Sequence, residues 1–184
     1  MEKSNKKPVV LTCDPSFTAW GWAVLQGNLV IEHGCIQTKP EAKKRRIREG
    51  DDRVRRTSEL IKALLDVIDN HKITFIVSEL PHGSQNAKAA VTMGVVLAVV
   101  QTLSDALEIP VEWYSEADAK KAVVGRISAS KREIQDAIDQ LYEVKWQFKP
   151  NGKPLEYYNE AVADALAIYF AAESNSPTLK FLNK

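Results

Sequence analysis

The sequence is poor in the features that mark secreted and membrane proteins. Its 184 residues contain only two cysteines, Cys13 and Cys35, which argues against a disulfide framework and fits a reducing cytoplasm. No uninterrupted apolar run approaches the roughly 20 residues that cross a bilayer, and the basic N-terminus leads into a strand rather than a signal-peptide core. We therefore expect a cytoplasmic protein without membrane contact, whose two thiols are buried and free.

The chain also lacks an excess of charge of either sign, since 25 basic residues meet 24 acidic ones. Its basic residues nevertheless concentrate between 39 and 56. Such a block in a neutral protein indicates contact with a polyanion, but it equally fits a solvated helix start with pairs such as Asp52 and Arg56. The arginines in question are Arg45, Arg46, Arg48, Arg53, Arg55 and Arg56.

No internal repeat or linker divides the chain, so we expect one domain over residues 1–184, with flexible tails at 1–7 and 174–184. The fold class is α/β: a mixed five-stranded sheet, made of an antiparallel meander plus parallel strands, with helices on both faces. Apolar β-branched runs predict strands at 9–14, 19–26, 29–37, 73–77 and 111–114. Helical spacing predicts helices at about 51–70, 85–107 (capped by Ser84), 116–124, 130–141 and 157–173.

Four acids occupy unusual places in this pattern. Asp14 ends the first strand and Glu79 follows the fourth, while Glu160 and Asp164 share one face of the last helix. Singly, each has an ordinary explanation as a turn residue, a solvated helix residue or a satisfied core carboxylate. If the four converge, however, their repulsion requires cations, and hard divalent ions such as Mg²⁺ fit carboxylate oxygens best.

The acids belong to a longer pattern that resembles the RNase H-like superfamily and, within it, the RuvC-type Holliday junction resolvases, closest to their divergent phage-type members. The resemblance extends over about residues 8–172. It is carried by Asp14-Pro15-Ser16 through Gly21-Trp22, by Glu79, by Ala119-Lys120-Lys121-Ala122-Val123-Val124-Gly125, by Ser128-Ala129-Ser130-Lys131 and by Ala163-Asp164-Ala165-Leu166-Ala167.

Three positions depart from that family pattern. Ser16 stands where glycine is common in the first motif. Ala161 stands where bacterial members carry an acid three residues before the last one, so that Glu160 would have to substitute for it. His82 stands where bacterial members carry an aromatic residue.

The resemblance implies a metal-dependent endonuclease that resolves four-way junctions, and other branched DNA, by symmetrical nicking that leaves a 5′-phosphate and a 3′-hydroxyl. It implies a homodimer joined through the helix at 85–107, in the cytoplasm of a bacterial cell or a phage-infected host. Two Mg²⁺ ions per active site, with Mn²⁺ as a substitute, would be held by Asp14, Glu79, Glu160 and Asp164. Lys131 and, to a lesser degree, Lys120 would steady the scissile phosphate, and the DNA-binding residues would be the six arginines, His82 and Lys121.

Two other functions fit the same fold. One is an RNase H-type nuclease acting on RNA–DNA hybrids, and the other is a non-catalytic protein that binds branched DNA. An actin-like or sugar-kinase ATPase domain also begins with a strand-ended acid, but that architecture needs two such domains, for which 184 residues are too few.

Overall fold

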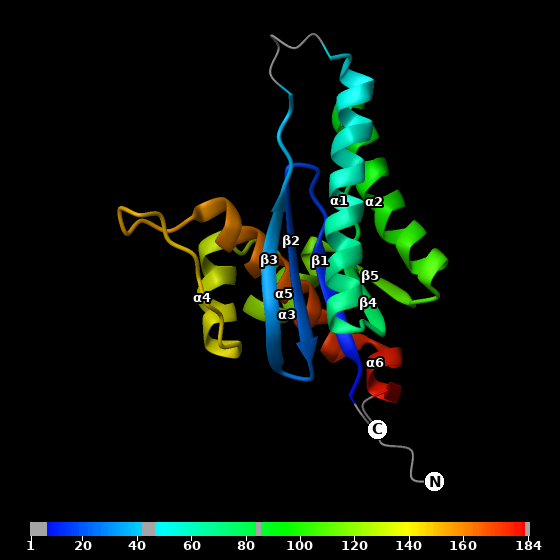
Figure 1. Ribbon diagram of the computed structural model, residues 1–184. Coiled ribbons are helices and arrows are strands. Elements are labelled where there is room, and N and C mark those ends of the chain that lie inside the picture. Colours follow the sequence, from blue (N-terminus) through cyan, green and yellow to red (C-terminus); the bar gives the residue numbers. More distant parts are fainter. Residues whose placement is uncertain (1–6, 42–46, 84–85, 183–184) are drawn as a thin grey trace.

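A five-stranded sheet forms the centre of the computed structural model, which describes residues 7–41, 47–83 and 86–182 (Figure 1). The strands lie in the order β3-β2-β1-β4-β5. β1, β2 and β3 form an antiparallel meander, whereas β4 runs parallel to β1 and β5 parallel to β4. The carboxyl ends of β1, β4 and β5 therefore share one edge of the sheet. The bounds are β1 (Val9–Asp14), β2 (Ala19–Gln26), β3 (Leu29–Gln37), β4 (Phe75–Glu79) and β5 (Val111–Tyr114).

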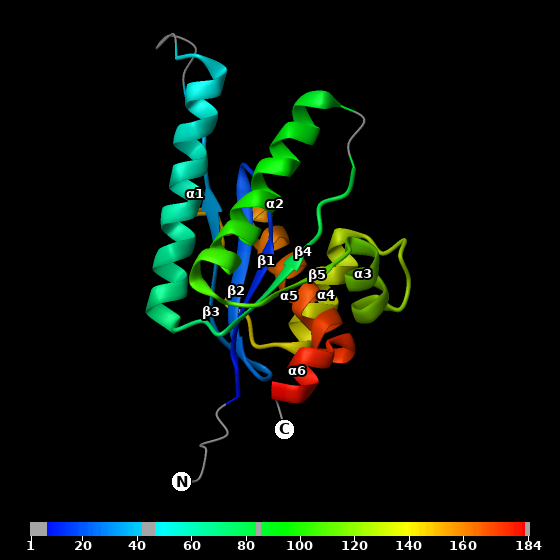
Figure 2. The same cartoon turned by 90° about the vertical axis from the view of Figure 1, so that its right-hand side faces the viewer.

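Helices cover both faces of the sheet, which confirms the predicted α/β architecture (Figure 2). α1 and α2 pack on one face, and α3 to α6 pack on the other. Side chains alternate along β1, so Leu11 and Cys13 lie under α1 and α2 while Val10 lies under α5. The helices are α1 (Glu49–His71), α2 (Ala87–Leu107), α3 (Glu116–Val124), α4 (Lys131–Leu141), α5 (Glu156–Asn175) and α6 (Pro177–Leu182).

The predicted bounds of β1, β2, β3 and β5 are confirmed, but β4 begins two residues later than predicted. Ile73 lies in the turn that closes α1, where its N–H donates to the carbonyl of Ile68 at 3.2 Å. β4 also continues two residues beyond the predicted Val77, so that Glu79 is its last residue. The cap of α2 also differs: Asn86 accepts the N–H groups of Lys88 and Ala89, whereas Ser84 lies outside the described residues.

The segment from residue 174 is not the frayed tail that the sequence predicted. α5 continues through Asn175, and α6 follows after Ser176, whose hydroxyl accepts the N–H of Leu179 at 2.9 Å. Leu179 is fully buried in the cluster beneath α5. A single apolar anchor thus holds this segment against the domain. The two cysteines are free, with Cys13 buried and Cys35 only partly buried.

Helix α2 is long and apolar enough, by length and composition, to cross a membrane, although it contains no uninterrupted apolar run of that length. The helix has 21 residues, and its mean hydropathy over an 18-residue window is 1.7. Only 28% of that window is buried. The search for uninterrupted apolar runs missed it, because Thr92 and Gln101 interrupt the run without lowering the average much. Since Val96, Val99 and Val100 pack into the core with α1 and the sheet, α2 is a core helix with one apolar face left uncovered.

Candidate active site

Asp14 and Glu79 lie side by side because of the sheet register. β1 and β4 are parallel, and the register pairs Cys13 with Ser78, so the next residue on each strand is an acid. Alternation along β1 places the Asp14 side chain on the same face as Val10, which is the face covered by α5. Helix α5 brings the third acid, Asp164, to this end of the sheet.

Helix α5 is docked unusually close to the strands beside these acids. A Cβ at Gly21 would lie 2.0 Å from the carbonyl oxygen of Ala161, so only glycine permits this approach. One turn further along, the buried hydroxyl of Thr12 donates to the carbonyl of Ala165 at 2.6 Å. The two anchor points flank Asp164, and they set its distance from the strand ends.

The pKa values show that the three carboxyls are crowded. Burial, followed by the charges of Asp164 and Glu79, raises the pKa of Asp14 well above its ordinary range. Burial, followed by the charges of Asp164 and Glu116, raises the pKa of Glu79 to about 7. Burial raises the pKa of Asp164 to about 6, although the nearby Lys131 ammonium lowers it. Like charges are therefore held together at this edge without enough compensation from the protein.

Each active-site lysine suggested by the sequence is paired with a glutamate at the rim of this cluster. The Lys131 ammonium lies 2.8 Å from Glu160, and this hydrogen bond raises the pKa of Lys131. The Lys120 ammonium lies 2.7 Å from Glu116. Glu160 is thus near the other acids, and adds to the raised pKa of Asp164, but its carboxylate is engaged by a lysine.

Glu116 is the site residue that the sequence reasoning missed. Its charge raises the pKa of all three buried acids, Asp14, Glu79 and Asp164. A signal was available: Glu116 is the first residue of α3, directly after the carboxyl end of β5. A residue in that place shares the edge at which β1 and β4 end.

The donor chemistry of this edge fits a hard divalent cation. Its ligands would be carboxylate oxygens, which Mg²⁺ prefers, and a cation would compensate the burial and the repulsion that raise the three pKa values. Within residues 7–41, 47–83 and 86–182, no three His, Cys, Asp or Glu side chains are arranged as a ready metal-binding group. The acids therefore form an open set whose side chains would have to close around an ion.

The turn after Asp14 accommodates the serine that departs from the family pattern. Among the described residues other than glycine, only Lys72 and Glu108 have positive φ, so the position of Ser16 does not require glycine. The Ser16 hydroxyl instead accepts the N–H groups of Thr18 and Ala19, both at 3.4 Å. The side chain helps to close the turn.

Arg56 fastens this same turn, which corrects its assignment to a DNA-contacting surface. It is only 8% exposed, and its guanidinium stacks 4.3 Å from the centre of the Phe17 ring. It donates to the hydroxyl of Thr38 at 2.8 Å and to the carbonyl of Phe17 at 3.0 Å, while Thr38 also donates to that carbonyl. Arg56 thus ties α1 to the loop that follows Asp14.

The remaining described arginines of the basic block are matched by acids on their own helix. Exposed pairs of this kind contribute about 0–1 kcal/mol each to stability. They favour the solvated helix start over the polyanion contact, and Arg45 and Arg46 lie outside the described residues. The pairs are Arg48 with Asp51 at 2.8 Å, Arg53 with Glu49 at 3.1 Å, and Arg55 with Asp52 at 2.7 Å.

The other two residues assigned to DNA are exposed: Lys121 is on α3, and His82 is on the loop after β4. Hydrogen bonds from Ser115 lower the pKa of Asp118, and smaller contributions come from the charges of Lys121 and His82. We call the end of the sheet where Asp14, Glu79 and Asp164 lie the acidic edge. Lys121 and His82 therefore lie near the part of the acidic edge where β5 ends.

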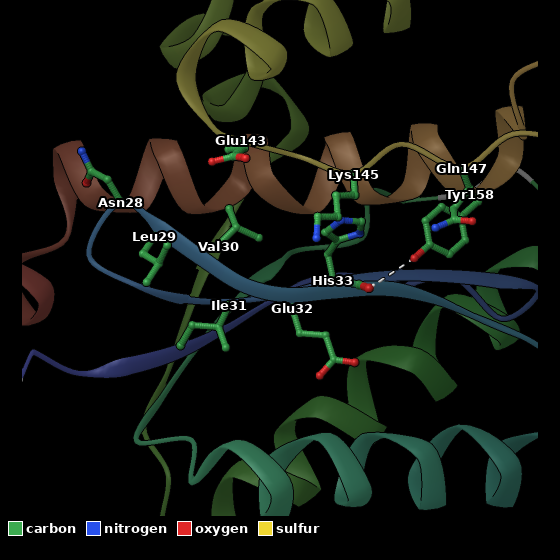
Figure 3. Close-up of a pocket in the computed structure, with 10 residues that line it drawn as sticks. All are labelled: Asn28, Leu29, Val30, Ile31, Glu32, His33, Glu143, Lys145, Gln147 and Tyr158. Atoms are coloured by element: carbon green, nitrogen blue, oxygen red, sulfur yellow. Dashed lines mark hydrogen bonds between the residues drawn. The ribbon is translucent and has the colours of Figure 1, made fainter.

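A groove of about 560 Å³ runs along the edge strand β3, and none of the four predicted acids lines it. Figure 3 shows Lys145 extending over His33 from the segment between α4 and α5. The Tyr158 hydroxyl donates to the carbonyl of His33 at 3.2 Å and so fastens the start of α5 to β3. Since Glu32 and Glu143 also line the groove, it offers a phosphate no uniform positive surface.

Comparison with known proteins agrees with this geometry. The family model described as crossover junction endodeoxyribonuclease RuvC matches residues 10–171. RuvC of Pseudothermotoga lettingae is 33% identical over 164 residues, and the match covers 87% of this chain and 90% of that protein. RuvC of Salinibacter ruber is 27% identical over 160 residues, and the match covers 87% of this chain and 82% of that protein. RuvC of T. thermophilus in complex with a Holliday junction substrate has the same fold, with a TM-score of 0.66 at 21% identity, covering 89% of this chain and 92% of that one.

The match extends over nearly the whole chain, and it includes β1, β4, α3, α4 and the acid-bearing half of α5. It confirms the resemblance seen in the sequence. The chain belongs to the RuvC family of crossover junction endodeoxyribonucleases, with the RNase H-like fold.

Proposed function

We propose that this chain is a metal-dependent endonuclease that resolves four-way DNA junctions by nicking two opposed strands. The observation that carries the proposal is the meeting of three carboxyls, from β1, β4 and α5, at one edge of the sheet, where burial and then nearby like charges raise their pKa values. The relatives support the substrate, because they are named crossover junction endodeoxyribonucleases and one is solved with a Holliday junction substrate.

Asp14, Glu79 and Asp164 would hold the metal, with Glu160 completing a second ion site. Two Mg²⁺ ions per site, replaceable by Mn²⁺, match this all-carboxylate set. Bound Mg²⁺ would lower the pKa of the attacking water and neutralise the charge that develops on the leaving oxygen. Hydrolysis of the bond between phosphorus and the 3′ oxygen leaves a 5′-phosphate and a 3′-hydroxyl.

The lysines would hold the scissile phosphate. Lys131 and Lys120 stand at the rim of the acid cluster as point charges, each already paired with a glutamate. A phosphate that enters the site would replace Glu160 or Glu116 as the lysine's partner. Release of Glu160 from Lys131 would at the same time free its carboxylate to bind metal.

The enzyme would act as a homodimer joined through α2, in the cytoplasm of a bacterial cell or a phage-infected host, where it meets DNA. The uncovered apolar face of α2, on which Val91 is 50% exposed, supports this interface. Two copies would place two acid clusters on one junction, as symmetrical nicking requires.

A substrate panel tests the proposal. The wild-type chain and Asp14→Asn would be incubated with and without Mg²⁺ on a mobile junction, an immobile junction, a flap and an RNA–DNA hybrid. We expect Mg²⁺-dependent nicks in opposed strands of the junctions by the wild type alone. Preferential cutting of the hybrid would instead identify an RNase H-type enzyme, and junction binding without cutting would identify a non-catalytic binder.

A further inference from the structure

The chain between α4 and α5 folds into a short hairpin, residues 145–155, which projects beside the start of α5 (Figure 1). Its tip is closed by two backbone hydrogen bonds, from the N–H of Lys149 to the carbonyl of Lys153 at 2.8 Å and from the N–H of Gly152 to the carbonyl of Lys149 at 2.9 Å. Gly152 has a φ of +77°, which a residue with a side chain rarely adopts. The hairpin is therefore a built feature of the sequence.

The base of the hairpin is fastened to the helix that carries the acids. The buried Asn159 side chain accepts the N–H of Gln147 at 2.9 Å and donates to its carbonyl at 3.0 Å. The Trp146 indole donates to Asp139 of α4 at 2.8 Å. Because Asn159 directly precedes Glu160, the hairpin is rigidly placed relative to the acidic edge.

The side chains on the outer surface of the hairpin are exposed, and the described ion pairs do not include its lysines. Phe148 is 59% exposed, and Lys149 and Lys153 are exposed on the same tip. No acid lies between Val144 and Leu155 in the sequence. Among the described residues, no ion pair involves a lysine of the hairpin, whereas the arginines of α1 are matched by acids. Within the part of the chain that the structure describes, the hydrophobic clusters therefore do not include Phe148, and the ion pairs do not include Lys149 or Lys153.

We propose that the hairpin is a DNA-contacting element of the enzyme, in which Lys149 and Lys153 bind backbone phosphates of a junction arm and Phe148 packs against the same arm, on the side of the molecule away from α2 (Figure 1). The inference rests on the proposed function. The hairpin and the acidic edge both adjoin the start of α5, because Asn159 holds the hairpin and Glu160 is the next residue, so DNA bound at the edge lies within reach of the hairpin. Unpaired lysines beside an exposed aromatic suit a nucleic acid better than an apolar protein surface. The order of the hairpin keeps the entropy cost of binding low.

Binding of a fluorescent four-way junction tests this, measured at several salt concentrations in the Asp14→Asn background, so that no cutting occurs. The hairpin variants are Lys149→Gln/Lys153→Gln and Phe148→Ala. The matched control is Lys62→Gln/Lys180→Gln, which removes two exposed lysines from α1 and α6. Thermal unfolding checks that each variant is folded.

The two hairpin variants have different expected signatures. Loss of two phosphate contacts should weaken junction binding about tenfold near 100 mM salt and reduce the slope of log affinity against log salt by about 2. Phe148→Ala should weaken junction binding several-fold, on the order of threefold to tenfold, and leave the slope unchanged, because the ring carries no charge. The control variant should bind like the parent.

The outcomes separate this inference from the proposed function. Normal junction binding and an unchanged salt slope in both hairpin variants would overturn the inference alone, and would leave a protein partner as the use of the exposed Phe148. Equal losses in the hairpin and control variants would overturn it as well, since the effect would then be one of general charge. A parent protein that binds no junction would overturn both.

Discussion

The acidic edge and the arginine-rich start of α1 use charge in opposite ways. At the edge, Asp14, Glu79 and Asp164 are held together by strand register and helix docking, and burial raises their pKa values, to which nearby like charges add. At the start of α1, positive charges are matched by acids three or four residues away. Charge that the fold leaves unbalanced indicates a site for a ligand, whereas balanced charge stabilises the helix that carries it.

The strongest challenge to this comparison is to remove one acid from each region. Asp14→Asn should reduce junction cleavage on the order of 10³-fold while leaving junction binding intact, because a neutral amide is a poor metal ligand. The matched control is Asp51→Asn, which removes an exposed acid from the start of α1, the region whose arginines are balanced by acids. This variant should change the cleavage rate less than about twofold. Single-turnover cleavage rates decide, and a variant Asp14→Asn that still nicks junctions would refute the role given to the edge.

A smaller loss is expected from Lys131→Met. This change removes a charge that faces the acid cluster and leaves Glu160 without its partner, so cleavage should fall about 10- to 100-fold. Arg132→Met is the control, because Arg132 is 91% exposed on its side chain and lies 3.9 Å from Asp136 in a weak pair. Similar losses in the two variants would show that general positive charge, rather than placement, is what matters.

The docking of α5 has its own test in Thr12→Val, which keeps the shape and removes the hydroxyl. We expect about 1 kcal/mol less stability and about tenfold slower cleavage, because Asp164 is carried by the turn that this hydroxyl fixes. Thr12→Ser retains the hydroxyl and should recover most of the rate. If the serine variant is as slow as the valine variant, the hydrogen bond does not position the acid.

The crowded acids should also make the metal-free protein less stable as the pH rises. Since the pKa of Glu79 is raised to about 7 in the folded state, the folded protein holds a proton that the unfolded chain has released. Stability is therefore lost between about pH 4.5 and pH 7 and is flat above that range.

Glu79→Gln removes this loss, so the variant should unfold at the same temperature as the wild type at pH 4.5 and about 3 °C higher at pH 8.5. Mg²⁺ should raise the unfolding temperature of the wild type more than that of the variant. Calorimetry at both pH values measures this, and a variant that is less stable than the wild type at pH 8.5 without metal would contradict the crowding.

The smallest effect is expected in the balanced region. Arg48→Gln/Arg53→Gln should change junction affinity less than about twofold and leave the salt slope unaltered, because both guanidinium groups are engaged by acids of α1. A slope reduced by about 2 would mean that these pairs open for DNA, and the contrast between the two regions would then disappear.

The sequence was sufficient for the strands because their signal is local. Runs such as Val9–Asp14 carry their own β-branched and apolar pattern, and the acids at the strand ends could be aligned by assuming a parallel sheet. The role of Glu116 required knowing that β5 ends at the same edge. The burial of Arg56 could not be predicted, because its partners Thr38 and Phe17 lie 18 and 39 residues away in the chain.

Charge patterning was misleading for a similar reason. Counting residues singled out the arginines of α1, but only the fold shows which cations are already paired. The hairpin lysines carry no such signal, because residues 145–156 have no periodic pattern in the sequence. Its order comes from Asn159, a helix residue whose hydrogen bonds cannot be foreseen from sequence spacing.

The most direct test of the central claim is religation of the products made from a four-way junction. We expect the wild type with Mg²⁺ to nick two opposed strands at symmetrical positions, so that DNA ligase reseals both nicks through a 5′-phosphate and a 3′-hydroxyl. Asp14→Asn should yield no nicks to reseal. Nicks that ligase cannot close, or cutting that is the same without Mg²⁺, would contradict the assignment of the acidic edge as a metal-dependent resolving site.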